Sequence, residues 1–246
     1  MHLSTRIIAT TFLILTSPLL NSPIQARAAY YTEFSLRIEG PNTTIFENII
    51  RTSGHIVTAA SGGTHMCDGT NNGANDKPGG TITSAIDDAV LTWDGTWDKQ
   101  TQEYLITSIA GYVQTENKYW GLLVGKPYKF TDKGGCQTKV TEGEEVLIAF
   151  DAFGASAFLK ASADLPTVKR GDNIVVTVVN GVDEKPVKDA VVLGMNTNGE
   201  GKVTIKFERS VGVHKFKATK LGAIRSNEII VTVTPKTKNS PGCTNE

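Results

Sequence analysis

Residues 61–76 read Ser-Gly-Gly-Thr-His-Met-Cys-Asp-Gly-Thr-Asn-Asn-Gly-Ala-Asn-Asp, and this polar stretch decides how the chain around it is interpreted. It belongs to a segment from Ala60 to Gly80 that is rich in Gly and Asn and has no regular hydrophobic period. A connection of about 20 residues is longer than most loops, and such loops either carry function or are fixed by a cross-link. Cys67 lies inside it, and Cys136 follows a Gly-Gly pair. The sequence therefore predicts a disulfide between Cys67 and Cys136 that closes a β-rich unit.

The segments around this loop carry the patterns of strands and of one helix. Apolar and polar residues alternate over 34–38, which is typical of a strand buried on one face. Apolar residues of 82–90 recur at the spacing of a helix face, and we expect its cap at Thr83 or Ser84. Further strands are expected at 44–50, 104–109, 119–124 and 146–150, and an aromatic turn at 92–98. This order predicts an α+β, β-grasp-like domain over residues 29–162, with one main helix on a mixed sheet.

The pattern changes after a boundary at residues 161–166. Apolar residues then alternate in short segments about a dozen residues apart, with turns between them. This spacing predicts an all-β sandwich of the immunoglobulin type over residues 163–235. Residues 236–246 are rich in Lys, Thr, Asn and Ser, and we expect them to form a disordered tail.

The first 28 residues have the parts of a secretory signal peptide. Arg6 precedes an apolar run, and Ala26-Arg27-Ala28 fits a small-x-small cleavage site. The apolar run of about 14 residues is shorter than the roughly 20 that a membrane-spanning helix requires. We therefore expect cleavage after Ala28 and a secreted protein, extracellular or associated with the cell surface, without a membrane span.

The charge of the expected mature chain is nearly balanced. Removing residues 1–28 takes away Arg6, Arg27 and no acid, so that 23 basic residues remain against 25 acidic ones, a net charge of −2. Nucleic acids and anionic membranes attract proteins through a clustered positive field, so neither is an expected partner.

Export would also determine the chemistry of the cysteines and of one asparagine. An oxidising compartment favours the Cys67–Cys136 disulfide, and closing a loop of about 70 residues stabilises the fold by roughly 4 kcal/mol. Cys243 is then left as a free thiol or as an intermolecular link. Asn42 begins the sequon Asn-Thr-Thr and is the expected glycosylation site in a host that glycosylates.

The polar loop and the strand before it contain residues of the types that bind zinc or calcium. Zinc ligands could be drawn from His55, His65, Cys67 and Asp68. Their spacing lacks the paired pattern of zinc sites, and a surface histidine beside a disulfide is favoured. The loop is not an EF-hand, because Gly79 stands where the twelfth-position Glu is required. An irregular calcium site remains open at Asp68, Asn71, Asn75 and Asp76. No metal or other cofactor is assigned.

An enzyme is the less favoured class. The carboxylates that could serve a hydrolase are Asp94, Asp98, Glu103 and Glu116. The sequence does not show the carboxylate separation that sugar hydrolysis needs. It contains no nucleophile elbow, metalloprotease helix or phosphate loop.

A binding surface is expected where the loop and the aromatic turn meet. Trp93 and Trp97 flank that turn and are favoured as surface residues, whereas Trp120 lies in an apolar strand and is expected in the core. The expected binding surface comprises His65, Asp68, Asn71, Asn72, Asn75, Trp93 and Trp97.

Several motifs of the first domain occur in an order known from one family. They are residues 34–40, 83–91, 104–111, 119–124 and the Gly143 turn before 146–150. This order resembles the transcobalamin C-terminal-like domain, a domain largely of unknown function. Residues 62–75 and 134–136 resemble its secreted fungal branch. The resemblance implies a β-grasp-like, non-catalytic module that is secreted or surface-attached; in transcobalamins such a domain forms half of a corrinoid clamp.

The second domain carries its own resemblance. Residues 186–192, 199–205 and 212–218 resemble immunoglobulin-like modules of extracellular adhesive proteins. Together these features predict a secreted, non-catalytic binding or adhesion protein whose partner is an extracellular protein, a glycan or a small molecule. The alternative is a corrinoid-like small-molecule carrier with a groove beside Trp120, and the least favoured is a secreted hydrolase.

Overall fold

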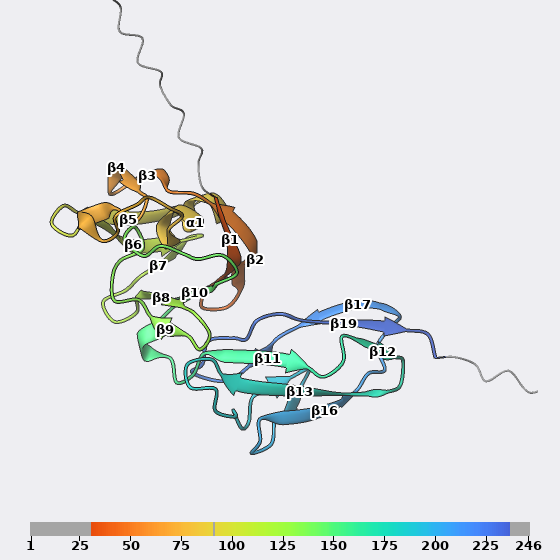
Figure 1. Ribbon diagram of the computed structural model, residues 1–246. Helices are drawn as coiled ribbons and strands as arrows, with labels where there is room; N and C mark the ends of the chain where they lie inside the picture. The colour runs from red at the N-terminus through yellow and green to blue at the C-terminus, as the bar shows by residue number, and fades with distance from the viewer. Residues whose placement is uncertain (1–30, 91, 237–246) are drawn as a thin grey trace, which may run out of the picture.

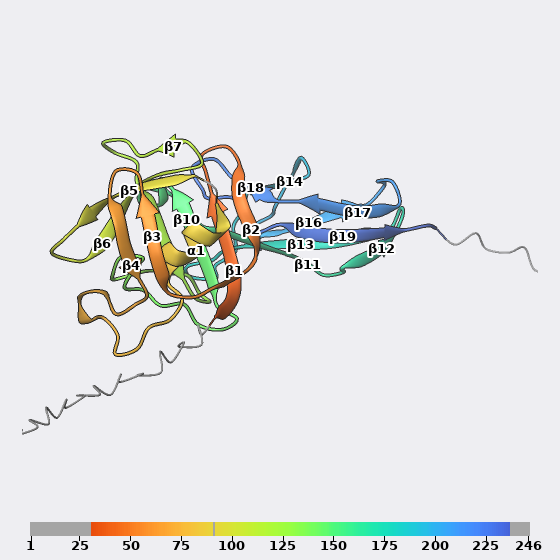
Figure 2. The ribbon, with the colours of Figure 1, turned by 90° about the horizontal axis from the view of Figure 1, so that it is seen from above.

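The computed structural model describes residues 31–90 and 92–236. The chain forms an N-terminal lobe, residues 31–155, and a C-terminal lobe, residues 156–236, which lie end to end (Figure 1) and can be followed from above in Figure 2. The expected signal peptide and nearly all of the expected tail, with Cys243, lie outside the described residues. Within the described ranges, no helix is both long and apolar enough to cross a membrane.

The N-terminal lobe is built on a five-stranded sheet. Its order is β2 (Thr44–Thr52), β1 (Thr32–Glu39), β10 (Glu145–Phe150), β8 (Trp120–Val124) and β9 (Lys129–Phe130). β1 and β10 are parallel, and the other neighbours are antiparallel. Val146 and Ile148 belong to the apolar core on one face, whereas Leu147 and Ala149 belong to the core on the other. β10 is a continuous apolar run because both of its faces are buried.

Helix α1 (Ile82–Ala89) packs on one face of this sheet through Ile82 and Ile86, which are fully buried. Thr81 is its N-cap: the Thr81 hydroxyl accepts a hydrogen bond from the Ser84 N–H, and the Ser84 hydroxyl accepts one from the Thr81 N–H. This capping box begins the helix, so the cap lies at Thr81 and not at Thr83 or Ser84 as expected.

Two smaller sheets complete the N-terminal lobe. β3 (His55–Ala59) and β4 (Gly63–Cys67) form a hairpin, and β5 (Trp93–Asp98), β6 (Glu103–Ile109) and β7 (Tyr112–Val113) form a three-stranded sheet. The expected aromatic turn at 92–98 is therefore wrong, because Trp93–Asp98 pairs with β6 along its whole length. Part of the polar loop is also regular, since β4 lies within it and is followed by a short 3-10 helix, η1 (Asn71–Gly73).

The C-terminal lobe contains three sheets of three strands. The first has the order β11 (Leu159–Ala163), β13 (Asn173–Asn180) and β16 (Lys202–Lys206). The second has the order β12 (Thr167–Lys169), β19 (Ile229–Thr234) and β17 (Gly212–Phe216). The third has the order β15 (Met195–Asn196), β14 (Val191–Val192) and β18 (Ala218–Thr219). Alternate residues of β13 and β19 enter one common apolar core.

This architecture corrects the predicted fold class. The described part of the chain is mostly β, with 48% of its residues in strands and 7% in helices, and the strands are spread over many small sheets. An α+β, β-grasp-like domain with one main helix on a mixed sheet, followed by a clear immunoglobulin-like sandwich, is therefore wrong. α1 has only eight residues, and turns with positive φ such as Leu193–Gly194 divide the C-terminal strands into pieces of two to eight residues. The domain limits of 29–162 and 163–235 stay a prediction.

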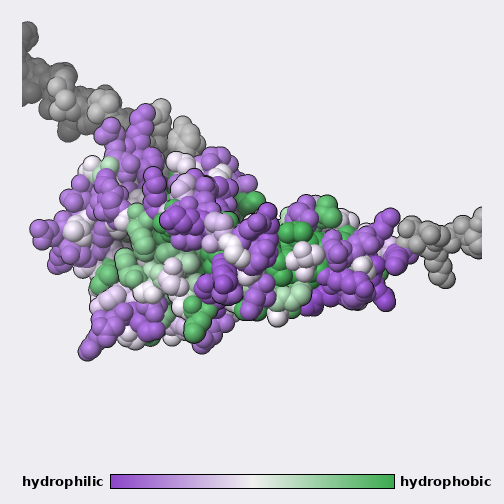
Figure 3. Space-filling model, turned by 90° about the horizontal axis from the view of Figure 1, so that it is seen from below, coloured by the Kyte–Doolittle hydropathy of each residue, from purple (hydrophilic) through white to green (hydrophobic). Residues whose placement is uncertain are grey.

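The two lobes meet through a separate apolar core. Leu123, Leu147 and Ala149, on the face of the five-stranded sheet opposite α1, pack with Phe158 and the partly buried Ile224. η2 (Ala152–Gly154) follows β10 at this junction. Seen from below, hydrophobic residues gather towards the junction and hydrophilic residues cover the outer ends (Figure 3). The central sheet is thus covered on both faces.

Candidate functional site

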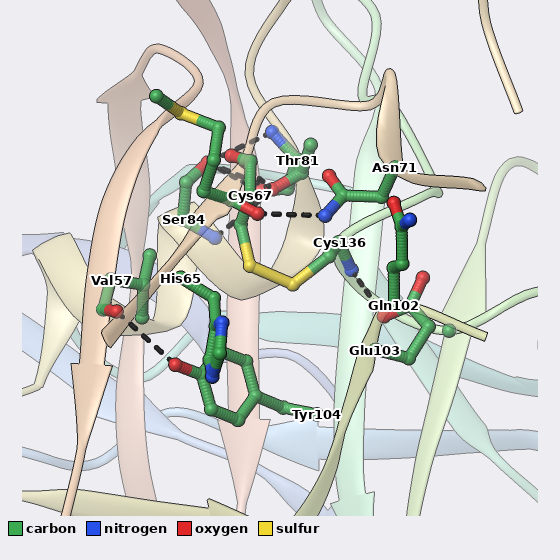
Figure 4. The surroundings of a disulfide bond; sticks show 12 residues. Val57, His65, Cys67, Asn71, Thr81, Ser84, Gln102, Glu103, Tyr104 and Cys136 are labelled. Atoms are coloured by element: carbon green, nitrogen blue, oxygen red, sulfur yellow. Dashed lines mark hydrogen bonds between the residues drawn. A yellow bond between two sulfur atoms is a disulfide. The ribbon is translucent and has the colours of Figure 1, made fainter. Parts of the chain in front are cut away.

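The expected disulfide is present and fixes the polar loop. Cys67 at the end of β4 is bonded to Cys136, their Cα atoms lie 4.4 Å apart, and both residues are fully buried (Figure 4). The Gly69 N–H donates to the Cys136 carbonyl oxygen at 2.9 Å. The Thr83 N–H of α1 donates to the carbonyl oxygen of Gly135 at 3.2 Å. The disulfide and these hydrogen bonds therefore connect the loop, the turn around Cys136 and the start of α1.

Glu103 lies beside this disulfide and holds the turn around Cys136 (Figure 4). Its carboxylate oxygens accept hydrogen bonds from the backbone N–H groups of Cys136, at 2.8 Å, and Gln137, at 2.7 Å. Burial raises the pKa of the Glu103 carboxyl to about 7, although both hydrogen bonds oppose the rise. A Cβ at Gly134 would lie 2.4 Å from the Glu103 carboxyl carbon, so the contact requires glycine there.

Most polar residues expected on the binding surface are engaged within the loop itself. The side chains of Asp68, Asn71 and Asn75 bond to nearby backbone groups, and Asp68 also accepts from a loop hydroxyl. Such bonds satisfy backbone groups that have no partner in a sheet. Asn72 differs, because it is exposed and only its backbone N–H is bound, to the Gln102 side chain at 2.7 Å. The first three residues shape the loop, and Asn72 is the one open to solvent.

His65 of β4 and Trp97 of β5 stack face to face. Their ring centroids lie 3.8 Å apart, the planes differ by 6°, and both residues are half-buried. Tyr104 supports them, because its ring meets Trp97 edge-on at 4.8 Å. Its hydroxyl donates to the carbonyl oxygens of Gly63, at 2.6 Å, and Val57, at 3.2 Å. The bond to Val57 is drawn in Figure 4. His65 and Trp97 are called the aromatic platform below. Its two residues come from separate segments that fold together.

Asp94 and Trp93 attach β5 to its surroundings. The Asp94 carboxylate accepts hydrogen bonds from the Ser61 hydroxyl, at 2.6 Å, and from the Ser61 N–H, at 2.8 Å, and these bonds lower the pKa of Asp94. The Trp93 indole N–H donates to Asp87 of α1 at 2.9 Å, and its ring meets Tyr104 edge-on at 5.4 Å. Trp93 therefore joins β5 to α1, and of the two indoles only Trp97 belongs to the platform.

The remaining candidate residues do not gather into a site. No group of three or more His, Cys, Asp or Glu side chains suited to a metal ion occurs in residues 31–90 and 92–236. Asp98 accepts hydrogen bonds from the two N–H groups of its own turn, whereas Asp94 and Glu103 bind different segments. Trp120 is 7% exposed and packs edge-on against Phe150, so it is a core residue.

Sequence reasoning identified His65 and Trp97 but missed Tyr104, the residue that holds them. Its only sequence signal is an inward position in an apolar strand, which does not distinguish a support residue from other core residues. Glu103 was assigned to possible hydrolysis, and its contact with the turn around Cys136 was not anticipated. The neighbouring Gly134-Gly135 pair is the one sequence feature that indicates such a close approach.

Comparisons with known proteins give one structural neighbour to report. No family model matches the chain, and no curated protein matches it by sequence. The crystal structure of haptocorrin, a transcobalamin-family protein, in complex with Cbi aligns with 50% of this chain at a TM-score of 0.29 and 14% identity. The alignment spans 25% of the haptocorrin chain. Similarity at this level does not establish a shared fold, so nothing about the haptocorrin ligand is transferred.

Proposed function

We propose that this chain is a secreted, non-catalytic binding module that holds an extracellular carbohydrate chain on the aromatic platform. The observation that supports this proposal is the parallel stack of His65 on Trp97, two residues that are both half-buried. A sugar ring has an apolar C–H face and a rim of hydroxyls, so it matches a flat aromatic surface with polar neighbours. Aromatic residues with a polar edge are enriched at binding surfaces for this reason.

The neighbours of the platform supply hydrogen-bonding groups for such a rim. β5 carries Asp94 and Asp98 in the same strand as Trp97, and their carboxylates accept hydrogen bonds from Ser61 and from the turn after β5. Carboxylates accept hydrogen bonds from hydroxyl donors at up to four lone-pair positions, so both can accept further bonds. Exposed Asn72, held next to Gln102, extends the polar surface from the loop.

The platform is rigid before a partner arrives. The disulfide fixes the end of β4, and the Tyr104 hydroxyl fixes both strands of the β3–β4 hairpin. A surface that is ordered in advance loses less conformational entropy on binding. This explains why an exposed loop would carry a buried disulfide and a buried tyrosine beneath it.

An array of immobilised polysaccharides and N-glycans tests the proposal, probed with the full chain from Ala29. We expect saturable binding to at least one glycan class. Trp97→Ala and His65→Ala should each weaken that binding about tenfold, the loss typical of a central aromatic contact. Affinity for the best glycan is then measured in solution by the change in tryptophan fluorescence.

Phe153→Ala provides the matched control. Phe153 is 68% exposed and stacks on Phe130 near the lobe junction, so it is an exposed aromatic residue outside the platform. Its replacement should leave glycan affinity unchanged. Equal binding by the Trp97→Ala and unchanged proteins, with both folded by circular dichroism, would contradict the assignment of the platform.

A further inference from the structure

The two lobes leave a cleft of about 340 Å³ between them. The N-terminal lobe contributes Glu39, Lys118 and Asp151, and the C-terminal lobe contributes the segment Gly222–Arg225. Sites for small molecules often lie between domains and have volumes from about 300 Å³ upwards. Glu39 and Arg225 are 186 residues apart in the chain, which is why no sequence pattern indicated this cleft.

Beside the cleft, Glu39 is at the centre of a group of ion pairs. Glu39 is 1% exposed and receives Arg225 and Lys217, each at 2.6 Å, and Arg37 at 3.6 Å. Lys217 also contacts Glu47, so three cations share two carboxylates among the contacts of the described residues. Of this group, Glu39 and Arg225 line the cleft, and Arg225 there presents a partly buried positive charge. A partly buried cation attracts an anion more strongly than an exposed one, because water screens it less.

The cations Lys118 and Arg225, which both line the cleft, retain unused donors. Arg225 commits its Nε and Nη2 to Glu39, but its Nη1 has only a long contact of 3.4 Å to the carbonyl oxygen of Pro41. Lys118 binds Asp151 through one contact of 2.8 Å and is 54% exposed. An ammonium group has three donors, and a guanidinium has five. Both residues can therefore donate to a further acceptor.

Asp151 is held in an uncommon conformation at the same place. Its φ is 58° and its ψ is 34°, the left-handed region that Asn and Asp occupy more readily than other non-glycine residues. Strained residues persist where the surrounding structure fixes them, and they cluster at binding sites. The conformation places the carboxylate against Lys118, where it occupies the position that an incoming anion would take.

We propose that this cleft is a binding site for a small hydroxy-carboxylate, an organic anion of the sugar-acid type. Its carboxylate binds between Lys118 and Arg225 and displaces Asp151 from Lys118. Its hydroxyl groups donate to backbone carbonyl oxygens of the Gly40–Pro41 turn. This site is separate from the aromatic platform, and it does not depend on the proposed carbohydrate function.

The test is an NMR titration of the chain from Ala29 with sodium gluconate. Glucose serves as the neutral counterpart, and sodium chloride matches the ionic strength. We expect saturable shifts with gluconate alone, centred on Lys118, Asp151 and the Gly222–Arg225 segment. Equal shifts with gluconate and glucose, shifts that sodium chloride reproduces, or no saturation would each overturn the proposal.

Two substitutions should change gluconate affinity in opposite directions. Lys118→Gln removes a charged donor and should raise the Kd about tenfold. Asp151→Asn removes the competing carboxylate and should lower the Kd up to about fivefold. Asn tolerates the left-handed conformation, so this variant keeps the backbone.

Lys129→Gln is the matched control, because Lys129 is an exposed lysine on β9 and does not line the cleft. Its gluconate affinity should be unchanged. If Lys118→Gln unfolds, the Asp151→Asn result alone decides the proposal. An Asp151→Asn protein with unchanged or weaker affinity would reject an anion site here.

Discussion

At the scale of single residues, Glu103 shows how burial and hydrogen bonding oppose each other. Two backbone N–H groups stabilise its charged form, yet removal from water is the larger effect and raises the pKa of this carboxyl from 4.5 to about 7. Between these two values the folded protein binds more protons than the unfolded chain. By linkage, the free energy of unfolding that Glu103 contributes is fully present below pH 4.5 and is lost as the pH rises through 7.

We therefore predict that the wild-type free energy of unfolding falls between pH 5 and pH 8, and that Glu103→Gln flattens this part of the profile. Gln is uncharged over the range and removes the titration. Urea unfolding at intervals of pH would measure both curves. Identical pH slopes for the two proteins would show that Glu103 does not titrate in this range.

At the scale of elements, the Cys67–Cys136 disulfide is the main constraint on the polar loop. The cysteines are 69 residues apart, so the bond removes many conformations from the unfolded chain. We predict that replacing both cysteines by Ala lowers the free energy of unfolding by about 4 kcal/mol. Urea titration measures this, with Cys243→Ala as the control that should behave as wild type. A double variant as stable as wild type would contradict the prediction.

The sequence allowed the strands and the disulfide to be predicted better than their assembly. Alternation over 34–38 and the apolar run of 146–150 correspond to β1 and β10, since burial imposes those patterns directly. Residues 93–98 were misread because two Trp-Asp pairs around Gly95 look like turn chemistry, whereas pairing with β6 makes them a strand. Thr81 was missed as the helix cap because Ser84 sits where a capping box usually has Glu or Gln.

In the candidate site, too, the residues could be predicted from the sequence but their contacts could not. His65 and Trp97 could be named from their residue types, but their stacking depends on the packing of the β3–β4 hairpin against β5, which is a tertiary contact. Asp68, Asn71 and Asn75 were placed on the surface because polar loops usually face water. Their actual bonds to backbone groups depend on the path of the loop, which local sequence does not specify.

At the scale of the whole molecule, Glu39 joins the lobes. This buried carboxylate of β1 binds Arg225 and Lys217, which both belong to the C-terminal lobe. Glu39→Gln would leave those cations without their main counter-charge, and we predict a loss of about 3 kcal/mol in the free energy of unfolding. Glu200→Gln removes an exposed partner, 3.5 Å from Lys202, and should leave stability unchanged. Equal effects of the two variants in urea titrations would refute a special role for Glu39.

Carbohydrate binding at the aromatic platform is tested most directly by NMR chemical-shift mapping with the best-binding oligosaccharide from the glycan array. We expect the largest shifts on His65, Trp97 and the adjoining residues of β4 and β5, with little change in the C-terminal lobe. Shifts concentrated at the cleft between the lobes, or on the C-terminal sheets, would contradict the assignment of carbohydrate binding to the aromatic platform.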